Sequence, residues 1–258
     1  MSIIKSVSLG AASLLAAAVL AGPSFADGLP GRGRVKAPET RTGPCATTAN
    51  VGLTTDYVFR GISQTNEEAA VQGGVDLTCG KFYAGVWASS FFGDEGSTEI
   101  DLYAGFRTST GRINWDLGFI YYTFPGSFGG DANYLELKAG ASGELWKGGT
   151  LGGTVFYTPE FSFESGAVVT VEGSFSQALP KVGMFSPTFS ATYGYSDFQD
   201  FSDLSYAYWN VGVSLAFHER WSLDLRYWDT DGEGLAFLAN LAGGLADERF
   251  VATLKYTF

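Results

Sequence analysis

The segment NVGLTTDYVFRGISQT, which begins at Asn50, alternates hydrophobic and aromatic side chains with glycine, polar and charged ones. The odd-numbered residues from Val51 to Phe59 share one parity, whereas Asp56 and Arg60 fall on the other. Because successive side chains of a β-strand point to opposite faces, the segment predicts a strand with one hydrophobic and one charged face. We expect the odd-numbered set to face lipid, and Asp56 and Arg60 to face the inside of a barrel.

The same period of two residues recurs along most of the chain, and helical periodicity is nearly absent. Twelve such segments lie near residues 49–60, 69–79, 82–91, 98–108, 112–124, 132–144, 149–158, 165–176, 187–196, 205–217, 220–229 and 249–258. Their connections alternate between short ones, such as Gly80 and 218–220, and longer ones, such as 61–70 and 196–205. An even number of antiparallel strands with short turns at one end and long loops at the other is typical of an outer-membrane barrel.

Several segments carry an aliphatic centre with an aromatic residue at each end. Trp115, Leu117, Phe119 and Tyr121 share one parity, and the pattern recurs from Ala207 to Phe217. Such a face suits lipid, with the rings at the two headgroup interfaces, whereas the core of a soluble β-sandwich needs no aromatic residues at both ends. In hydrocarbon every backbone N–H and C=O needs a partner, so the sheet must close. We therefore predict an all-β fold: a single transmembrane, antiparallel, up-and-down β-barrel of twelve strands, with short periplasmic turns and longer acidic extracellular loops.

The first residues predict export. Lys5 precedes the apolar run LGAASLLAAAVLA, which is too short to span a bilayer, and Ser24 and Ala26 supply the small residues of a cleavage site. We expect a signal peptide over 1–26, a periplasmic Pro/Gly-rich leader over 27–47 and the barrel over 48–258. The expected location is the outer membrane of a Gram-negative bacterium.

The charge balance excludes one class of partner. The formal net charge of the 258-residue chain is −11, and removal of Lys5, a single positive charge, makes it −12. So acidic a surface would repel a phosphate backbone, and we expect no nucleic acid partner. The long connections are rich in acids, among them Glu67 and Glu68, which could share divalent ions with lipopolysaccharide.

The charged parity of the predicted strands supplies the candidate pore-lining residues. They are Asp56, Arg60, Asp76, Glu99, Asp101, Arg107, Asp116, Glu136, Lys138, Glu172, Asp224, Arg226 and Lys255, eight acids against five bases. The excess of acid favours cations if a water path exists. Opposite charges could instead pair across the lumen and close it, because twelve strands lie between the filled barrels of about eight and the wide porins of about sixteen. The residues leave both alternatives open.

Two further predictions concern the edges of the barrel. Cys45 precedes the first predicted strand and Cys79 ends the second, so both fall at the periplasmic rim, in an oxidising compartment where we expect a disulfide. The chain ends RFVATLKYTF, in which Phe250, Tyr256 and the terminal Phe258 share one parity. This ending resembles the terminal strand that the barrel-assembly machinery recognises.

No catalytic or metal site is expected. His218 is the single histidine and falls in a predicted periplasmic turn, away from substrate, and one histidine with two distant cysteines supplies no zinc ligand set. DTDGEG at 229–234 has oxygen ligands at alternate positions, but Asn240 stands where a calcium loop needs its bidentate Glu, so a solvated acidic loop is the preferred interpretation. We expect no cofactor and no enzyme.

Two segments carry a family resemblance. NVGLTTDYVFRGISQT and NYLELKAG, at 133–140, resemble signature segments of the TorF family of outer-membrane porins, which have a Gcw_chp-type conserved domain. The resemblance covers about Thr48 to Phe258 and implies a barrel and a pore. Its motifs are structural, so it brings no functional residues to this chain.

These observations predict a porin-like channel for passive diffusion of small polar solutes, preferably cationic or neutral. A non-conducting structural or adhesive barrel with a charge-plugged lumen is the alternative. A passenger-carrying barrel is disfavoured because the segment over 27–48 is too short to be a passenger. The solute, association into a homo-oligomer and the position of the segment 229–249 are left open by the sequence.

Overall fold

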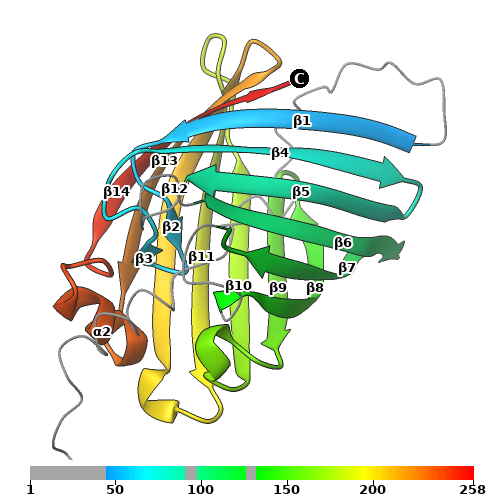
Figure 1. Cartoon of the computed structure of the whole chain (residues 1–258). Helices are drawn as coiled ribbons and strands as arrows, with labels where there is room; N and C mark the ends of the chain where they lie inside the picture. Colours follow the sequence, from blue (N-terminus) through cyan, green and yellow to red (C-terminus); the bar gives the residue numbers. More distant parts are fainter. Residues whose placement is uncertain (1–44, 91–97, 126–131) are drawn as a thin grey trace, which may run out of the picture.

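The chain forms a closed barrel (Figure 1). The computed structural model describes residues 45–90, 98–125 and 132–258. The predicted signal peptide and the leader up to residue 44 lie outside the described residues, as do parts of two long connections, 91–97 and 126–131. The last three residues of the predicted leader, 45–47, already belong to the first strand.

The barrel wall has twelve antiparallel strands, as predicted. They are β1 (Cys45–Thr54), β4 (Ala70–Cys79), β5 (Phe82–Ser90), β6 (Thr98–Thr110), β7 (Ile113–Thr123), β8 (Tyr134–Trp146), β9 (Gly149–Thr158), β10 (Val168–Ala178), β11 (Ser186–Phe198), β12 (Tyr206–Phe217), β13 (Trp221–Thr230) and β14 (Arg249–Thr257). Each strand pairs with its neighbours in the wall, and β14 pairs with β1 from Asn50↔Thr257 to Thr54↔Thr253. The sheet therefore has no open edge, as a sheet in hydrocarbon requires.

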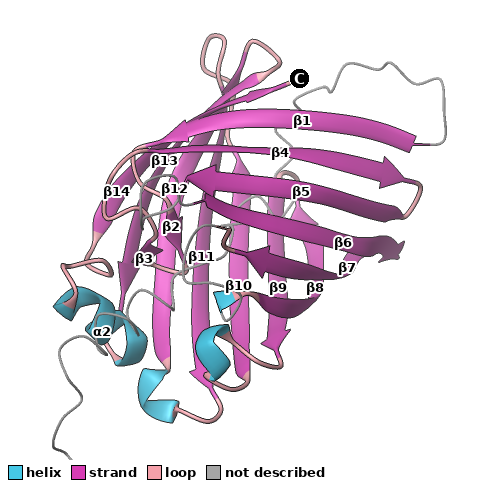
Figure 2. Ribbon diagram, viewed as in Figure 1, coloured by secondary structure: helices cyan, strands magenta, loops and turns pink. Residues whose placement is uncertain are grey.

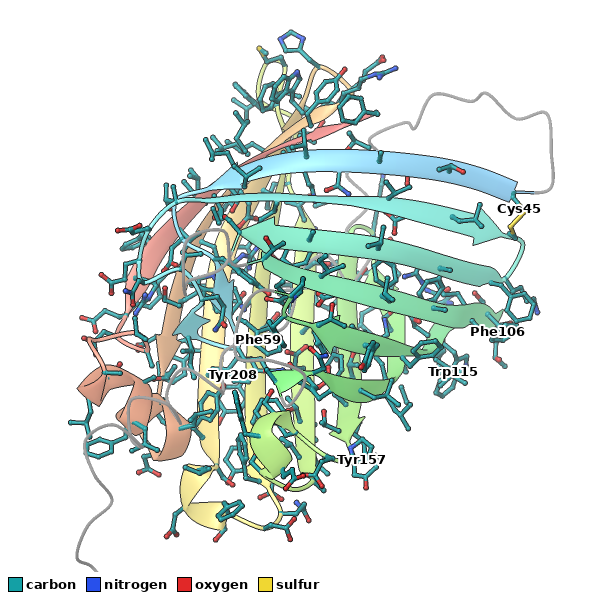
Figure 3. All side chains as sticks on the ribbon, in the orientation of Figure 1. Cys45, Phe59, Phe106, Trp115, Tyr157 and Tyr208 are labelled. Carbon is teal, nitrogen blue, oxygen red and sulfur yellow. A yellow bond between two sulfur atoms is a disulfide. The ribbon has the colours of Figure 1, made fainter. Side chains whose placement is uncertain are left out.

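The side chains that alternate along each strand face the outside and the inside of the barrel in turn. In β7, Trp115, Leu117 and Phe119 are 40%, 50% and 43% exposed, while Ile120 and Tyr122 on the other parity are buried. Phe106, Trp115 and Tyr157 project from the outer surface, whereas Tyr208 lies inside the barrel (Figure 3). The exposed hydrophobic belt is the face that lipid would cover.

The two ends of the barrel differ. Strands at one end, here called the turn end, are joined by two or three residues, apart from the longer connection 179–185. At the other, the loop end, lie the longer connections with two 3₁₀ helices, η2 (Ser162–Glu164) and η3 (Ser202–Leu204), and the helix α2 (Gly234–Leu241) (Figure 2). Within the described residues, none of the helices has the length and apolar character needed to cross a membrane.

The predicted disulfide is confirmed. Cys45 and Cys79 stand directly opposite each other in the ladder between β1 and β4, and their sulfur atoms are bonded. The bond lies at the turn end and joins the first residue of β1 to the last residue of β4 (Figure 3).

One strand prediction is wrong. The first wall strand ends at Thr54, not at residue 60, and the chain then turns into the barrel to form the short strands β2 (Val58–Phe59) and β3 (Ile62–Ser63). Tyr57 and Phe59, expected to face lipid, are 2% and 7% exposed inside the barrel. A hairpin has the same period of two residues as a wall strand, so the alternation alone could not separate the two.

Candidate functional site

The segment from Asp56 to Thr65, here called the inward hairpin, lies in the barrel interior. Arg60 and Gly61 form its two-residue turn, and both have positive φ, 47° and 85°. Positive φ at both central residues is the geometry of the tight hairpin turn that Gly favours. A Cβ on Gly61 would lie 2.6 Å from Cγ2 of Thr230 in β13, so glycine is required here for space as well as for conformation.

The inward hairpin contacts the wall on nearly all sides. Tyr57 packs on Trp87 of β5, and Phe59 packs near Tyr122 of β7, with ring centroids 5.4 Å and 6.4 Å apart. Val58 belongs to a buried cluster with Trp228 of β13 and Val251 of β14. The turn of the inward hairpin lies against β12 and β13 at Gly61. The hairpin therefore occupies the lumen at this level.

A buried ion pair fixes the hairpin turn to the wall. Nη2 of Arg60 donates to both carboxylate oxygens of Glu136 in β8, at 3.0 and 2.9 Å, and the two side chains are 8% and 2% exposed. The Tyr122 hydroxyl also donates to Glu136, and the Arg60 guanidinium lies 4.9 Å from the Phe156 ring centroid. A buried pair of this kind holds its partners in place because breaking it leaves an unpaired charge.

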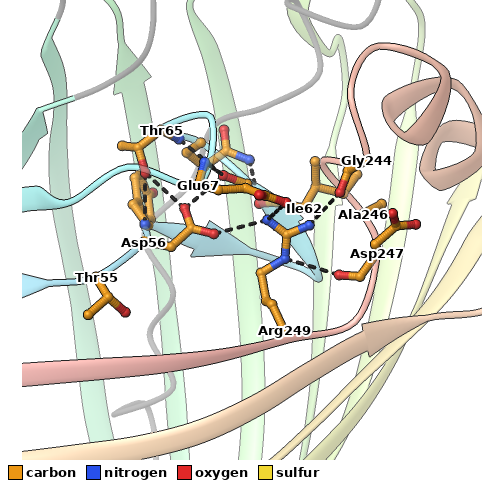
Figure 4. Close-up of polar contacts among 12 residues, drawn as sticks. Thr55, Asp56, Ile62, Thr65, Glu67, Gly244, Ala246, Asp247 and Arg249 are labelled. Atoms are coloured by element: carbon orange, nitrogen blue, oxygen red, sulfur yellow. Dashed lines mark hydrogen bonds and ion pairs between the residues drawn. The ribbon is translucent and has the colours of Figure 1, made fainter.

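A second set of contacts fixes the base of the hairpin (Figure 4). Nη1 of Arg249, the first residue of β14, lies 3.0 Å from Oδ2 of Asp56 and 3.3 Å from Oε1 of Glu67. Asp56 Oδ1 accepts hydrogen bonds from the hydroxyls of Ser63 and Thr65, at 2.7 and 2.8 Å. Residues far apart in sequence thus hold the hairpin closed upon itself and against the barrel wall.

The segment Gly234 to Ala246 packs over the interior at the loop end. Leu235, Ala236 and Ala239 of α2 are buried in one hydrophobic cluster with aromatic side chains of the wall and with Ile62 of the hairpin. The carbonyl of Leu245 accepts a hydrogen bond from the backbone N–H of Ser63, at 2.7 Å. The 229–249 connection therefore supports the inward hairpin, which answers the question that the sequence left open.

Two carboxylates lie beneath the hairpin. Glu99 and Asp101 are on the inward parity of β6 and both are 0% exposed. Oε1 of Glu99 accepts a hydrogen bond from the Tyr57 hydroxyl, at 3.2 Å. Oε2 of Glu99 and both carboxylate oxygens of Asp101 have no hydrogen-bond partner in the part of the chain that the structure describes.

The turn-end half of the interior is more open. Asp116 of β7 accepts from Tyr83, Arg107 and Lys138, at 2.7, 3.1 and 3.1 Å. The Arg107 side chain is 59% exposed and stacks on the Tyr83 ring. That ring lies against Gly105, where a Cβ would be only 2.3 Å from the Tyr83 hydroxyl oxygen, so glycine gives the ring its place on the inner wall.

The remaining candidates also lie on the inward parity. Asp76 accepts from Tyr103, and Glu172 accepts from Tyr208. Arg226 donates to Asp224, at 2.9 Å between Nη2 and Oδ2, and also to Asn210 and Ser190. Half-buried positions are held by Asp76, Asp116, Lys138, Glu172, Asp224 and Lys255. Six of the thirteen candidates, Asp56, Arg60, Glu99, Asp101, Glu136 and Arg226, are therefore buried, and the other seven are half-buried or exposed.

Several residues that build the site have no charge pattern to reveal them. The alternation marks Arg249 only as the start of a strand, yet Arg249 holds the hairpin through Asp56. The same alternation places Tyr57 on the lipid face, although its hydroxyl contacts Glu99 inside the barrel. The dipeptide Arg60-Gly61, between Val58-Phe59 and Ile62-Ser63, is the local signal of a tight turn that could have revealed the hairpin.

The terminal strand and the single histidine lie where the sequence placed them. Phe250 and Phe258 are exposed, and the Tyr256 ring packs between Trp221 and Phe258, with centroids 4.8 and 5.0 Å away. His218 is an exposed turn residue between β12 and β13. The role of the three aromatic residues in barrel assembly stays a prediction.

The acidic sequence DTDGEG forms backbone contacts. Asp231 accepts from the N–H groups of Ala207 and Glu233, at 2.8 and 3.1 Å, and Asp229 accepts from that of Thr230. Across 45–90, 98–125 and 132–258, the structure groups no three His, Cys, Asp or Glu side chains in a way that could hold a metal ion. These carboxylates therefore order the connection between β13 and α2.

Comparisons with known proteins agree with the fold. Residues 38–258 match the sequence model of a family described as "Bacterial protein of unknown function (Gcw_chp)", as the resemblance in the sequence predicted. A structure titled "KdgM porin" is similar at a TM-score of 0.55 and 10% identity, covering 83% of this chain and 99% of that one. One titled "NanC porin structure in rhombohedral crystal form" has a TM-score of 0.51 at 9% identity, with 83% and 99% covered. The search of curated proteins found no match.

Proposed function

Because this chain belongs to the Gcw_chp family of bacterial proteins, whose description assigns no function, we propose its function from the barrel itself. It is an outer-membrane channel of a Gram-negative bacterium, through which small polar solutes, cationic or neutral, diffuse passively. The observation that carries the proposal is a closed barrel with a hydrophobic belt outside and charged side chains inside. The similar KdgM and NanC structures are porins by title, and this likeness of fold adds an analogy.

The inward hairpin is the constriction of this channel. Its side chains contact β5, β7 and β8, and its turn reaches β12 and β13 on the other side. The turn-end half of the lumen, lined by Asp76, Arg107 and Lys255 among others, is the wide part of the path. A solute must pass the level of the hairpin, so this level determines the conductance.

A weak preference for cations is part of the proposal. The thirteen inward candidates include eight acids and five bases, and Arg249 adds a sixth base because its side chain is 9% exposed beside Asp56. The excess of acid therefore falls from three to two. A low-dielectric wall concentrates the field of such charges on the lumen, so a small excess still favours cations.

Planar-bilayer recordings test the proposal. The purified full chain should give small, discrete conductance steps, and a variant with Tyr57–Thr65 replaced by a short Gly/Ser linker should give larger ones. In a salt gradient the reversal potential should have the sign of a cation-preferring pore. Silence of both proteins would contradict the channel.

A closed structural or adhesive barrel is the second candidate. The contacts that the inward hairpin makes around the lumen favour it, together with the buried loop-end cluster that includes α2. In that case the acidic connections at the loop end would bind lipopolysaccharide, through shared divalent ions, or another partner. Binding of vesicles that contain lipopolysaccharide by an electrically silent wild-type protein would select this candidate.

A further inference from the structure

Glu99 and Asp101 form a buried pair of carboxylates, for which the described residues provide no salt-bridge partner. They stand two residues apart on the inward face of β6, both 0% exposed, and their side chains lie next to each other. Three of their four oxygens have no hydrogen-bond partner within 45–90, 98–125 and 132–258. Among the residues that the structure describes, neither carboxylate forms a salt bridge.

Among the described residues, the groups that act on the pair are uncharged or acidic. Its titratable neighbours are Tyr57 of the inward hairpin, Tyr103 of β6 itself, Tyr122 of β7, and Tyr134 and Glu136 of β8. On the β5 side, Trp87 and Ser89 stand opposite Asp101 and Glu99 and carry no charge. The two buried arginines of the hairpin contacts are both paired elsewhere, because Arg60 pairs with Glu136 and Arg249 pairs with Asp56.

Two adjacent carboxylates in a buried site cannot both stay ionised without a partner. A single proton shared between them removes one charge and supplies an O–H donor to the unpartnered oxygens. We propose that Glu99 and Asp101 form a proton-binding site beneath the seated hairpin, and that loss of this proton releases the hairpin and widens the lumen. This inference rests on the proposed channel, whose constriction it regulates.

The direction of the effect follows from linkage. The seated hairpin excludes water and places the Tyr57 hydroxyl on Glu99, so this state binds the shared proton more tightly than a state in which water reaches the pair. Acid therefore favours the seated hairpin. Rising pH removes the proton, leaves two like charges beneath the hairpin and favours the open lumen.

Conductance measured as a function of pH tests the proposal. From about pH 5 to about pH 9, the range in which buried carboxyls are known to titrate, the wild type should show a several-fold rise in mean conductance. The double variant Glu99→Gln/Asp101→Asn mimics the protonated pair, so it should stay at the low conductance throughout. Glu68→Gln is the control, since it neutralises an exposed loop acid and should keep the wild-type response.

Three outcomes would overturn the proton site: a wild-type conductance that is independent of pH, a double variant that keeps the full response, or a wild-type response that follows added calcium at constant pH. A second readout separates this inference from the channel itself. Hydrogen exchange of the Asp56–Thr65 amides, corrected for intrinsic rates, should accelerate at alkaline pH in the wild type and not in the double variant. Accelerated exchange in a silent barrel would refute the channel only, and unchanged exchange in the wild type would refute the proton site.

Discussion

The two halves of the barrel interior share one wall and one alternation of side chains, yet they are built differently. In the loop-end half, the ion pair Arg60–Glu136 is 8% and 2% exposed and lies among aromatic rings. In the turn-end half, the pair Arg107–Asp116 is 59% and 19% exposed. The same kind of contact is thus buried in one half and partly solvated in the other.

The connections account for this difference. At the loop end, residues 55–69 and 231–248 are long enough to return to the interior and fill it. At the turn end, connections such as 80–81 and 111–112 are too short to return to the interior. We infer that the loop-end half controls passage, whereas the turn-end half, with the disulfide and the chain terminus, secures the closed wall.

Replacing the inward hairpin should have the largest effect. A Gly/Ser linker in place of Tyr57–Thr65 removes the contacts with Glu136 and Glu99 and should raise the single-channel conductance several-fold. As a control, shortening the turn-end connection 179–185 should leave conductance unchanged. Equal effects of the two changes would show that the halves do not differ in function.

Deletion of Phe258 should impair assembly. The backbone N–H of Phe258 donates to Ala49 at 2.8 Å, so the last residue takes part in closing β14 upon β1. We expect a strong loss of the protein from the outer membrane, measured by fractionation and immunoblotting, while the barrels that form conduct normally. Wild-type outer-membrane levels of the truncated protein would contradict this role.

The two ion pairs should differ in their contribution to stability. Arg60→Met leaves Glu136 buried and unpaired, which should lower the free energy of unfolding by about 3–5 kcal/mol. Arg107→Met, the matched change in the exposed pair, should lower it by only about 0–1 kcal/mol. Urea unfolding from lipid vesicles measures both values. Adding Glu136→Gln to Arg60→Met should recover part of the loss, and a larger loss in the double variant would argue against the pair.

Removal of the disulfide should act on the turn end alone. Cys45 and Cys79 are 34 residues apart, and closing a loop of this length stabilises by about 3–4 kcal/mol in the chain-entropy model. The variant Cys45→Ser/Cys79→Ser should lose up to that amount in urea unfolding. Its conductance should match that of the wild type, because the bond lies away from the inward hairpin. A changed conductance would show that the two ends are coupled.

Charge neutralisation should give the smallest effect. If Asp56, Glu99, Asp101 and Glu136 line the path, replacing several of them by Asn or Gln should move the reversal potential in a salt gradient toward zero. Their burial beside the hairpin limits this effect, so Asp76→Asn in the more open half should shift the potential more than replacement of these buried residues. Glu68→Gln, an exposed loop acid that salt screens within about 10 Å at 0.1 M, is the control and should shift it least.

The number of strands, their pairing order and the sorting of connections could be read from the sequence because each depends on a local, repeated signal. The period of two residues separates an outer from an inner face in every wall strand, as Leu117 and Tyr122 illustrate in β7. Cys45 and Cys79 could be paired because Cys45 begins its strand and Cys79 ends the next wall strand, at the same end of the barrel. The alternation also assigned the charged candidates to the inner face.

What fills that inner face depended on tertiary structure. The sequence by itself determined a closed barrel with a hydrophobic outside, a charged inside, short turns at one end and long connections at the other. Only the three-dimensional structure showed that Tyr57 and Phe59 leave the lipid face, that Arg249 holds Asp56, and that Glu99 and Asp101 are buried together. The physical reason is that alternation reports which side of a strand a residue occupies, whereas burial inside the lumen depends on segments distant in sequence that fold back across it.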